Sequence, residues 1–141
     1  MEFVRAYAAI ANGGILVTPT LIKGGQGATT SIGMPASERK VLIEGMRGSI
    51  LDGTARAMNR SDVEFAGKTG TAELGSTKKF VNSWVAGFYP YQKPKYAFIL
   101  LMEHGPRQNL FGASPAMAGF FNWVKQNKPE YLLDLDSVQD E

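Results

Sequence analysis

The feature that most constrains the fold is a nearly unbroken apolar run at residues 96–102. Its length is typical of a strand and far short of a membrane-spanning helix, which needs about 20 residues. A strand without polar alternation is typically covered on both faces, and we predict one over residues 95–103. Two further strands are predicted at residues 63–71, ending in a tight glycine feature, and 80–89. The short connections between the three favour an antiparallel meander.

Helical periodicity flanks these strands on both sides. The apolar spacing predicts helices over residues 2–12 and 37–51, and a third that begins near Ser114. Ser37 and Ser114 are expected to act as N-caps, with Pro115 at the first helical position of the last helix. The side chains expected to face the core are Phe3, Val4, Tyr7, Ala8 and Ala11, then Leu42, Ile43, Met46 and Ile50, then Met117, Phe120, Phe121 and Val124.

Composition is that of one ordinary globular unit. The 141 residues are 44% hydrophobic and 20% charged, and they contain no internal repeat or convincing linker. We therefore predict an α+β domain over residues 1–128, with helices packed on an antiparallel sheet, and an acidic, loosely ordered tail at 129–141. Residues 23–34 should form an exposed loop. Trp84 and Phe88 are expected in the core rather than as a platform for a ligand.

Charge and residue types argue against several classes of function. The net charge is +2 without a long basic run, which leaves no footprint for nucleic acid. There is no cysteine and a single histidine, His104, so thiol catalysis, disulfides and multi-histidine metal sites are excluded, and we expect neither metal nor cofactor. His104 is expected at a strand end without a catalytic task. The first residues read as an amphipathic helix rather than a signal peptide.

The chemically informative stretch is residues 67–73, Gly-Lys-Thr-Gly-Thr-Ala-Glu. Lys68 offers a fixed positive charge, and Gly70 removes a side chain where a ligand could approach the backbone. Because side chains alternate along a strand, the hydroxyls of Thr69 and Thr71 should lie on one face and Lys68 on the other. Such groups could cradle the carboxylate of an extended peptide. A lone Lys-Thr-Gly recurs by chance, however, and is more often a decorated strand end.

The neighbouring sequence adds four segments in a consistent order. Residues 6–14 form the first helix, Gly53-Thr54-Ala55 stands upstream of the motif, residues 65–73 contain it, and residues 83–90 follow it. Together these segments resemble the class B penicillin-binding proteins, the peptidoglycan transpeptidases, over nearly the whole chain. The resemblance is nearest to the elongation-type enzyme, with the division type a close second.

This resemblance implies roles for the motif residues. Lys68 would face a catalytic serine, assisting proton transfer and binding anionic substrate. Thr69, Gly70 and Thr71 would bind the carboxylate of a stem peptide or of a β-lactam, and the backbone N–H of Thr71 would be one of two oxyanion donors. The resemblance also implies that residues 1–128 are the C-terminal portion of a transpeptidase domain with the β-lactamase/transpeptidase-like fold.

The nucleophile of that family is not recognised in this chain. The family uses S-x-x-K, then S-x-N, then K-T-G. Ser37 begins an S-x-x-K match, but no S-x-N lies within residues 41–67 and the spacing to Lys68 is too short. A second match begins at Ser76, after the K-T-G, in a predicted turn. We interpret both as surface features and expect the serine, the second motif and a membrane anchor to lie outside this chain.

The expected function is therefore part of a D,D-transpeptidase at the extracytoplasmic face of the bacterial inner membrane, with the fragment alone inactive. Its expected ligands are peptidoglycan stem peptides and β-lactams. Two alternatives remain: a non-catalytic β-lactam sensor or binding module, and a serine β-lactamase or carboxypeptidase of the same fold. In the family fold the strand at 95–103 has a further neighbour, so its exposed edge is expected to associate with the missing N-terminal part of the domain or with another copy.

Overall fold

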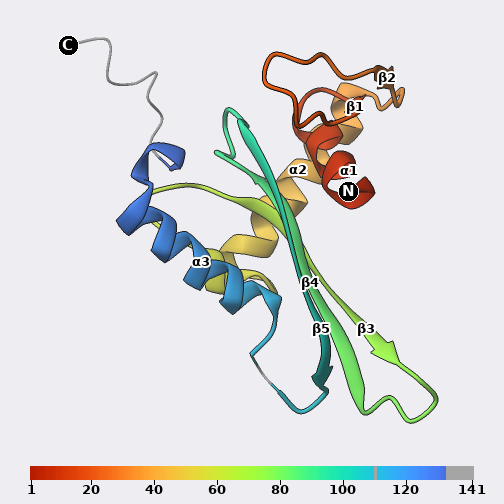
Figure 1. Ribbon diagram of the computed structural model, residues 1–141, viewed down its shortest axis with the longest axis vertical. Helices are drawn as coiled ribbons and strands as arrows, with labels where there is room; N and C mark the ends of the chain where they lie inside the picture. The colour runs from red at the N-terminus through yellow and green to blue at the C-terminus, as the bar shows by residue number, and fades with distance from the viewer. Residues whose placement is uncertain (110, 133–141) are drawn as a thin grey trace.

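The computed structural model describes residues 1–109 and 111–132, and its elements follow the predicted order closely. In chain order they are α1 (Glu2–Ala11), β1 (Ile15–Val17), β2 (Thr29–Ser31), α2 (Ala36–Leu51), the 3-10 helix η1 (Arg56–Met58), β3 (Ala66–Leu74), β4 (Phe80–Tyr89), β5 (Tyr96–Pro106), α3 (Ala113–Asn127) and the 3-10 helix η2 (Pro129–Tyr131). The predicted α+β class is confirmed (Figure 1).

A three-stranded antiparallel sheet in the order β3-β4-β5 forms the centre of the molecule. β3 pairs with β4 along its whole length, so that Thr69 lies opposite Val85 and Thr71 opposite Ser83. β4 pairs with β5 in the same antiparallel manner, apart from a register shift between Val81 and Ser83. The predicted meander is confirmed, and β3 and β5 are the two edges of this sheet within the described residues.

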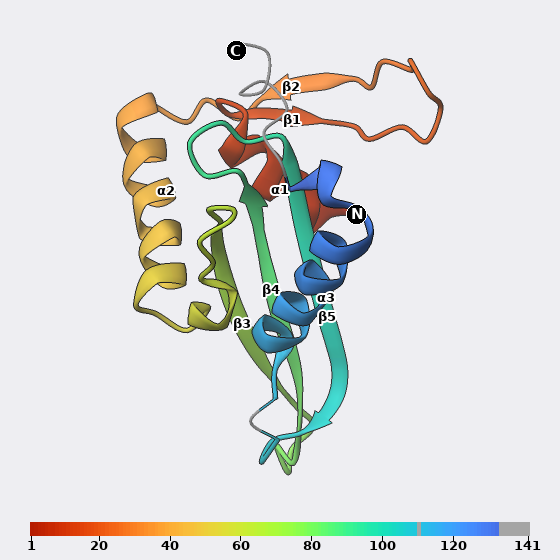
Figure 2. The same cartoon turned by 90° about the vertical axis from the view of Figure 1, so that its left-hand side faces the viewer.

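Helices pack on both faces of the sheet. α3 lies on one face and α1 on the other, while α2 runs beside β3 (Figures 1 and 2). The larger core lies under α3, where Phe121 is 1% exposed and its ring centroid is 4.5 Å from that of Phe65 and 5.6 Å from that of Phe98. A smaller core joins Met46 of α2 to Phe88 on the opposite face. The burial expected for Phe88 is thus confirmed.

The segment expected to be an exposed loop contains a short strand. β2 pairs with β1, with Leu16 opposite Thr30, and the resulting hairpin extends away from the main sheet (Figure 2). All three side chains of β2 are exposed, as expected for this segment. β2 could not be predicted, because Thr-Thr-Ser has no alternation of apolar and polar residues. The strand forms through its backbone pairing with β1.

Both predicted N-caps are wrong. α2 begins at Ala36 and α3 at Ala113, which places Ser37 and Ser114 one residue inside their helices, and neither forms a capping hydrogen bond. The first N–H of α3 instead donates to a distant partner, Oγ of Ser83 on β4, at 2.9 Å. A serine thirty positions away in the chain therefore satisfies a donor that local sequence would assign to a neighbour.

The buried faces of α2 and α3 are narrower than predicted. Phe121 is buried in α3, but Phe120 is 52% exposed and packs edge-on against Phe121 and beside Trp123. The expectation of a core position for Phe120 is wrong because it lies at the margin of the i, i+3, i+4 face. In α2, Leu42 lies at the corresponding margin and is 40% exposed, which also corrects its predicted burial.

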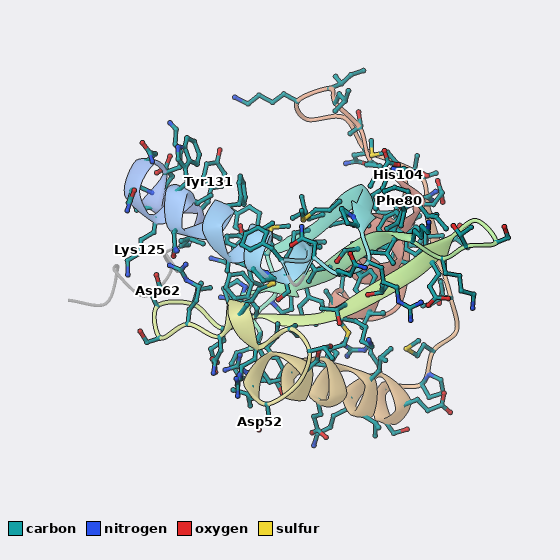
Figure 3. All side chains as sticks on the ribbon, turned by 90° about the horizontal axis from the view of Figure 1, so that it is seen from below. Asp52, Asp62, Phe80, His104, Lys125 and Tyr131 are labelled. Carbon is teal, nitrogen blue, oxygen red and sulfur yellow. The ribbon has the colours of Figure 1, made fainter. Side chains whose placement is uncertain are left out.

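An ion-pair network ties the loop before β3 to α3. Two guanidinium nitrogens of Arg60 donate to the carboxylate of Asp62 at 2.8 and 2.7 Å, and Lys125 of α3 lies 3.1 Å from the same carboxylate. Figure 3 shows Asp62 and Lys125 pointing toward one another. The hydrogen bond from Arg60, reinforced by one from Lys125, holds the pKa of Asp62 well below its ordinary value despite some desolvation. Asp62 is thus ionised at neutral pH.

The end of the described chain includes part of the segment expected to be a loose tail. η2 covers Pro129–Tyr131 and Leu132 is buried, while the remainder of that prediction lies outside the described residues. Across residues 1–109 and 111–132, none of the helices has both the length and the apolar character needed to cross a membrane.

Candidate functional site

The Lys-Thr-Gly-Thr stretch at residues 68–71 lies in the middle of β3. β3 continues to Leu74, so the expectation that the strand ends at this glycine is wrong. Gly70 is not among the glycines with positive φ, and it pairs with Trp84 of β4 like any other strand residue. The motif is consequently held by backbone pairing on both sides of the glycine and forms a regular stretch of edge strand.

The side chains of the motif alternate between the two faces of β3, as predicted. Thr69 lies opposite Val85, which is fully buried in the core beneath α3, whereas Lys68 lies opposite Ala86. Lys68 lines cavities with residues of α1 and α2. Thr71 borders one of these cavities, and it also lines a cleft beside the loop that leads into α3. The cation and the two hydroxyls therefore flank the same edge from opposite faces.

Lys68 is exposed and has no carboxylate partner within the described residues. Its Nζ donates a hydrogen bond to the carbonyl of Thr69 at 2.6 Å. An ammonium group has three donors, so the contact with Thr69 leaves donors for a ligand. The arrangement provides a cation whose charge is not already neutralised by a neighbouring carboxylate.

Two largely apolar cavities meet at Lys68. One, of about 270 Å³, is lined by Phe3, Trp84 and residues 68–72, and the other, of about 470 Å³, is lined by Val41 and Leu42 of α2. Tyr7 lines both, and burial raises the pKa of its phenol, so the group is neutral at physiological pH. These cavities place a fixed positive charge against apolar surface, where an anion is attracted more strongly than in open water.

Trp84 differs from its expected role as a core residue. It is half-buried, stacks on Phe3 with ring centroids 5.4 Å apart, and lines the smaller cavity beside Gly70. A Cβ built on Gly70 would meet only Cβ of Trp84, at an ordinary 3.6 Å. The sheet does not itself require glycine at position 70, and its absent side chain leaves space open in front of the backbone.

Near the C-terminal end of β3, Glu73 forms two ion pairs. The carboxylate of Glu73 lies 2.8 Å from Lys78 and 3.0 Å from Arg107. Glu73 and Arg107 line a cleft of about 430 Å³ together with Thr71 and Ser83. Fixed charges of both signs therefore lie in this cleft, whereas Lys68 is the one charged side chain among the described residues that line the two cavities on its side.

The two S-x-x-K matches form no serine–lysine pair. Ser37 is exposed on α2, and Nζ of Lys40 lies 3.8 Å from Glu44. Ser76 is exposed in the turn between β3 and β4. Within the described residues, no cluster of three or more His, Cys, Asp or Glu side chains could hold a metal ion. His104 lies near the end of β5 and stacks on Phe80 with ring centroids 4.1 Å apart (Figure 3).

One site contact was not predicted from the sequence. Oγ1 of Thr54 lies 2.5 Å from Oγ1 of Thr69. Thr54 belongs to the Gly-Thr-Ala segment already singled out, but nothing in its spacing shows that the chain after α2 returns to β3. The structure thus adds a third hydroxyl to those expected from the motif alone.

Comparison with known proteins gives a consistent picture. Residues 1–124 match the family described as the penicillin binding protein transpeptidase domain. Peptidoglycan D,D-transpeptidase PbpA of Mycolicibacterium smegmatis is 34% identical, with 74% of this chain and 24% of that relative covered. Penicillin-binding protein 2B from Streptococcus pneumoniae has a similar fold, with a TM-score of 0.74, 23% identity, and 91% of this chain and 25% of that chain covered.

A second solved structure, PBPA from Mycobacterium tuberculosis, is 28% identical with a TM-score of 0.64, covering 82% of this chain and 30% of that chain. The chain spans about a quarter of the length of the PbpA relatives that it matches.

Proposed function

The chain belongs to the penicillin-binding transpeptidase family, and we propose that it forms one wall of the active site of a peptidoglycan D,D-transpeptidase of class B, completed by residues outside this chain. The observation that carries this proposal is the exposed cation of Lys68 beside the hydroxyls of Thr69 and Thr71 on an edge strand. The names of the curated relatives support the same reaction, and the resemblance of the motifs favours an elongation-type enzyme.

We infer that the wall binds the terminal carboxylate of a D-Ala-D-Ala stem peptide, or the carboxylate of a β-lactam. Lys68 would supply the charge, and Thr69 and Thr71 would donate hydrogen bonds. Charge-assisted hydrogen bonds to a carboxylate are roughly twice as strong as neutral ones, so this set suits an anion better than an uncharged amide. The open space at Gly70 would let the peptide lie close to the backbone of β3.

The backbone of β3 supports a second role, that of oxyanion donor. In an antiparallel strand, the N–H and C=O of one residue point to the same side and alternate from residue to residue. The carbonyl of Thr69 accepts a hydrogen bond from Lys68 Nζ, which fits a position on the free edge of β3. With a period of two, the N–H of Thr71 would lie on that edge as well. Losing one such donor costs about 100- to 1,000-fold in other acyl-transfer enzymes.

The bond-making groups would come from outside these residues. A serine hydroxyl would attack the carbonyl between the two D-alanines, transferring its proton through a base, and the terminal D-Ala would leave as the protonated amine. The amine of a neighbouring stem peptide would then attack the acyl-serine ester, forming the cross-link and releasing the serine. Lys68 would assist proton transfer and stabilise the anionic substrate throughout.

The remaining part of the domain would cover the open face of this chain. Val41 and Leu42 of α2 and Phe3 of α1 are 68%, 40% and 62% exposed, and they surround the cavities at Lys68. β5 is an edge of the sheet, and its partly apolar strand could accept a further strand or a second copy of the chain. A monodisperse monomer in light scattering, with no second chain present, would contradict association through this edge. We further propose that the whole enzyme works at the extracytoplasmic face of the inner membrane, anchored by a segment outside this chain.

Covalent labelling with a fluorescent penicillin tests the proposal. The chain alone should not be labelled, whereas the transpeptidase assembled from this chain and the serine-bearing part should acquire one penicilloyl adduct on a serine outside residues 1–141. Labelling of the isolated chain that disappears in Ser37→Ala would overturn our interpretation of that serine.

In the assembled enzyme, Lys68→Ala should slow acylation by penicillin and by stem peptide roughly 100-fold or more, since it removes a charge that acts in the transition state. Lys40→Ala, which removes an exposed lysine of α2, is the matched control and should leave the rate within about twofold. Unchanged acylation of Lys68→Ala would refute the role given to Lys68.

A further inference from the structure

The Gly-Thr-Ala segment at residues 53–55 connects α2 to η1, and no part of the proposed reaction yet uses it. A Cβ on Gly53 would lie 2.8 Å from Cα of Ser49, so only glycine lets the chain turn back against α2 at this point. Ala55 is fully buried, and its N–H donates to the carbonyl of Ser49 at 3.0 Å. Gly53 and Ala55 are therefore fixed by packing, and together they present the side chain between them toward β3.

Thr54 is that side chain, and packing does not account for it. It is exposed, and its hydroxyl lies 2.5 Å from the hydroxyl of Thr69, at the short end of hydroxyl–hydroxyl contacts. A serine, an alanine or a valine would satisfy the same backbone, since the residue is not part of either core. The hydroxyl of Thr54 thus has one evident effect, which is on the hydroxyl of Thr69.

The direction of this hydrogen bond follows from the ligand that the wall would bind. A carboxylate only accepts hydrogen bonds, so Thr69 must turn its proton toward the ligand. Its oxygen is then left as an acceptor, and Thr54 is placed to donate to it. Donation from Thr54 polarises the Thr69 hydroxyl and strengthens its bond to the anion, because hydrogen bonds in a chain reinforce one another.

We propose that Thr54 is a positioning residue, which orients the Thr69 hydroxyl for the ligand's carboxylate and acts through Thr69 alone. This inference rests on the proposed function, because it assumes an anionic ligand at the β3 edge. Losing a net hydrogen bond to a neutral partner corresponds to roughly a fivefold effect, and more when the bond supports one to a charged group. We expect Thr54→Val to lower acylation efficiency roughly five- to tenfold.

Acylation of the assembled transpeptidase by benzylpenicillin and by its methyl ester provides the test. Thr54→Val is nearly isosteric and replaces the hydroxyl with a methyl group. Thr54→Ser keeps a hydroxyl at this position. The loss in Thr54→Val should be five- to tenfold with the free acid and less than about twofold with the ester, since the ester presents no carboxylate. Thr54→Ser should recover most of the lost rate. Thr30→Val, at an exposed position of β2, is the matched control for removing a threonine hydroxyl.

A double-mutant cycle with Thr69→Val separates positioning from direct contact. If Thr54 acts only through Thr69, adding Thr54→Val to Thr69→Val should cause no further loss. A further loss in the double variant would overturn the inference, as would an equal loss with acid and ester, which indicates a structural role. Should Thr54→Val fail to fold, Thr54→Ala is a second hydroxyl-free variant for the same comparison.

The two proposals fail in different ways. An assembled wild-type enzyme that penicillin does not acylate would refute the proposed function, and this inference with it. A wild-type enzyme that is acylated normally, beside a Thr54→Val variant that keeps the wild-type rate with the free acid, would refute the inference alone.

Discussion

Gly87 of β4 lies directly opposite Gly67 of β3, one residue before the motif begins. A Cβ on Gly87 would lie 2.1 Å from the carbonyl oxygen of Ala66 and 2.8 Å from Cα of Gly67. Both atoms belong to the backbone, so no side-chain rotation relieves the contact. An ordinary carbon–oxygen contact needs about 3.3 Å, so Gly87→Ala should force the two strands apart by about 1 Å.

The free energy of this change follows from two effects. Overpacking a closely packed site costs about 1–3 kcal/mol, and a weakened backbone hydrogen bond between β3 and β4 adds about 1 kcal/mol. We therefore expect Gly87→Ala to lower the free energy of unfolding by about 2–4 kcal/mol. With a urea dependence of about 2 kcal/mol per molar, the unfolding midpoint should fall by about 1–2 M.

Urea unfolding followed by tryptophan fluorescence measures this shift, and amide NMR spectra locate it. Gly70→Ala is the matched control, because its Cβ would meet only Trp84 at 3.6 Å, and its midpoint should move by less than about 0.5 M. In Gly87→Ala the amide resonances of residues 68–71 should shift with the displaced strand. Equal midpoints for the two variants, with unmoved resonances at 68–71, would refute the argument that this glycine sets the position of β3.

Two further predictions concern the attachment of α3. Phe121→Ala should lower the free energy of unfolding by about 3–5 kcal/mol, and Phe120→Ala by about 1 kcal/mol or less, because only Phe121 is buried; equal urea midpoints would contradict this. Asp62→Asn should destabilise the chain at pH 7. Because Arg60 and Lys125 lower the folded-state pKa of Asp62, its contribution is present above its unfolded pKa of about 3.9 and disappears as pH falls toward the lower folded value. The difference between wild type and Asp62→Asn in urea midpoint should thus shrink from pH 6 to pH 2, and a constant difference would exclude Asp62 as the cause.

The strands of the main sheet could be predicted because their apolar side chains mark the positions that are buried in the core. The bounds of β4 were predicted without error, and those of β5 within three residues, since the apolar run is interrupted only where the strand leaves the core. The N-caps of α2 and α3 could not be predicted, because Ser37 and Ser114 are good caps in isolation. The two helices begin at Ala36 and Ala113, so each serine lies inside its helix. At α3, the choice depends on Ser83, which is distant in sequence and reaches the helix only in the folded chain.

The arrangement of the motif residues on β3 could be predicted for a different reason. Lys68, Thr69 and Thr71 are adjacent in sequence, and strand alternation alone assigns their faces. The two cavities at Lys68 could not be predicted, because they depend on how α1 and α2 pack against the sheet. The contact of Thr54 with Thr69 depends on a reversal of the chain at Gly53, whose need for glycine becomes visible only once Ser49 is in place.

The hydrogen bond between Ser83 and Ala113 makes the two faces of β3 differ in how firmly they are held. Ser83 lies opposite Thr71, so the strand neighbouring the motif is tied to the beginning of α3, and further along that helix Lys125 is tied to Asp62, a few residues before β3. β4, α3 and the loop before β3 are therefore linked to one another on the face of the sheet that carries Thr69 and Thr71. The Lys68 side has apolar cavities and exposed helix surface instead, so we expect any rearrangement on ligand binding to occur on that side while the hydroxyls stay in place.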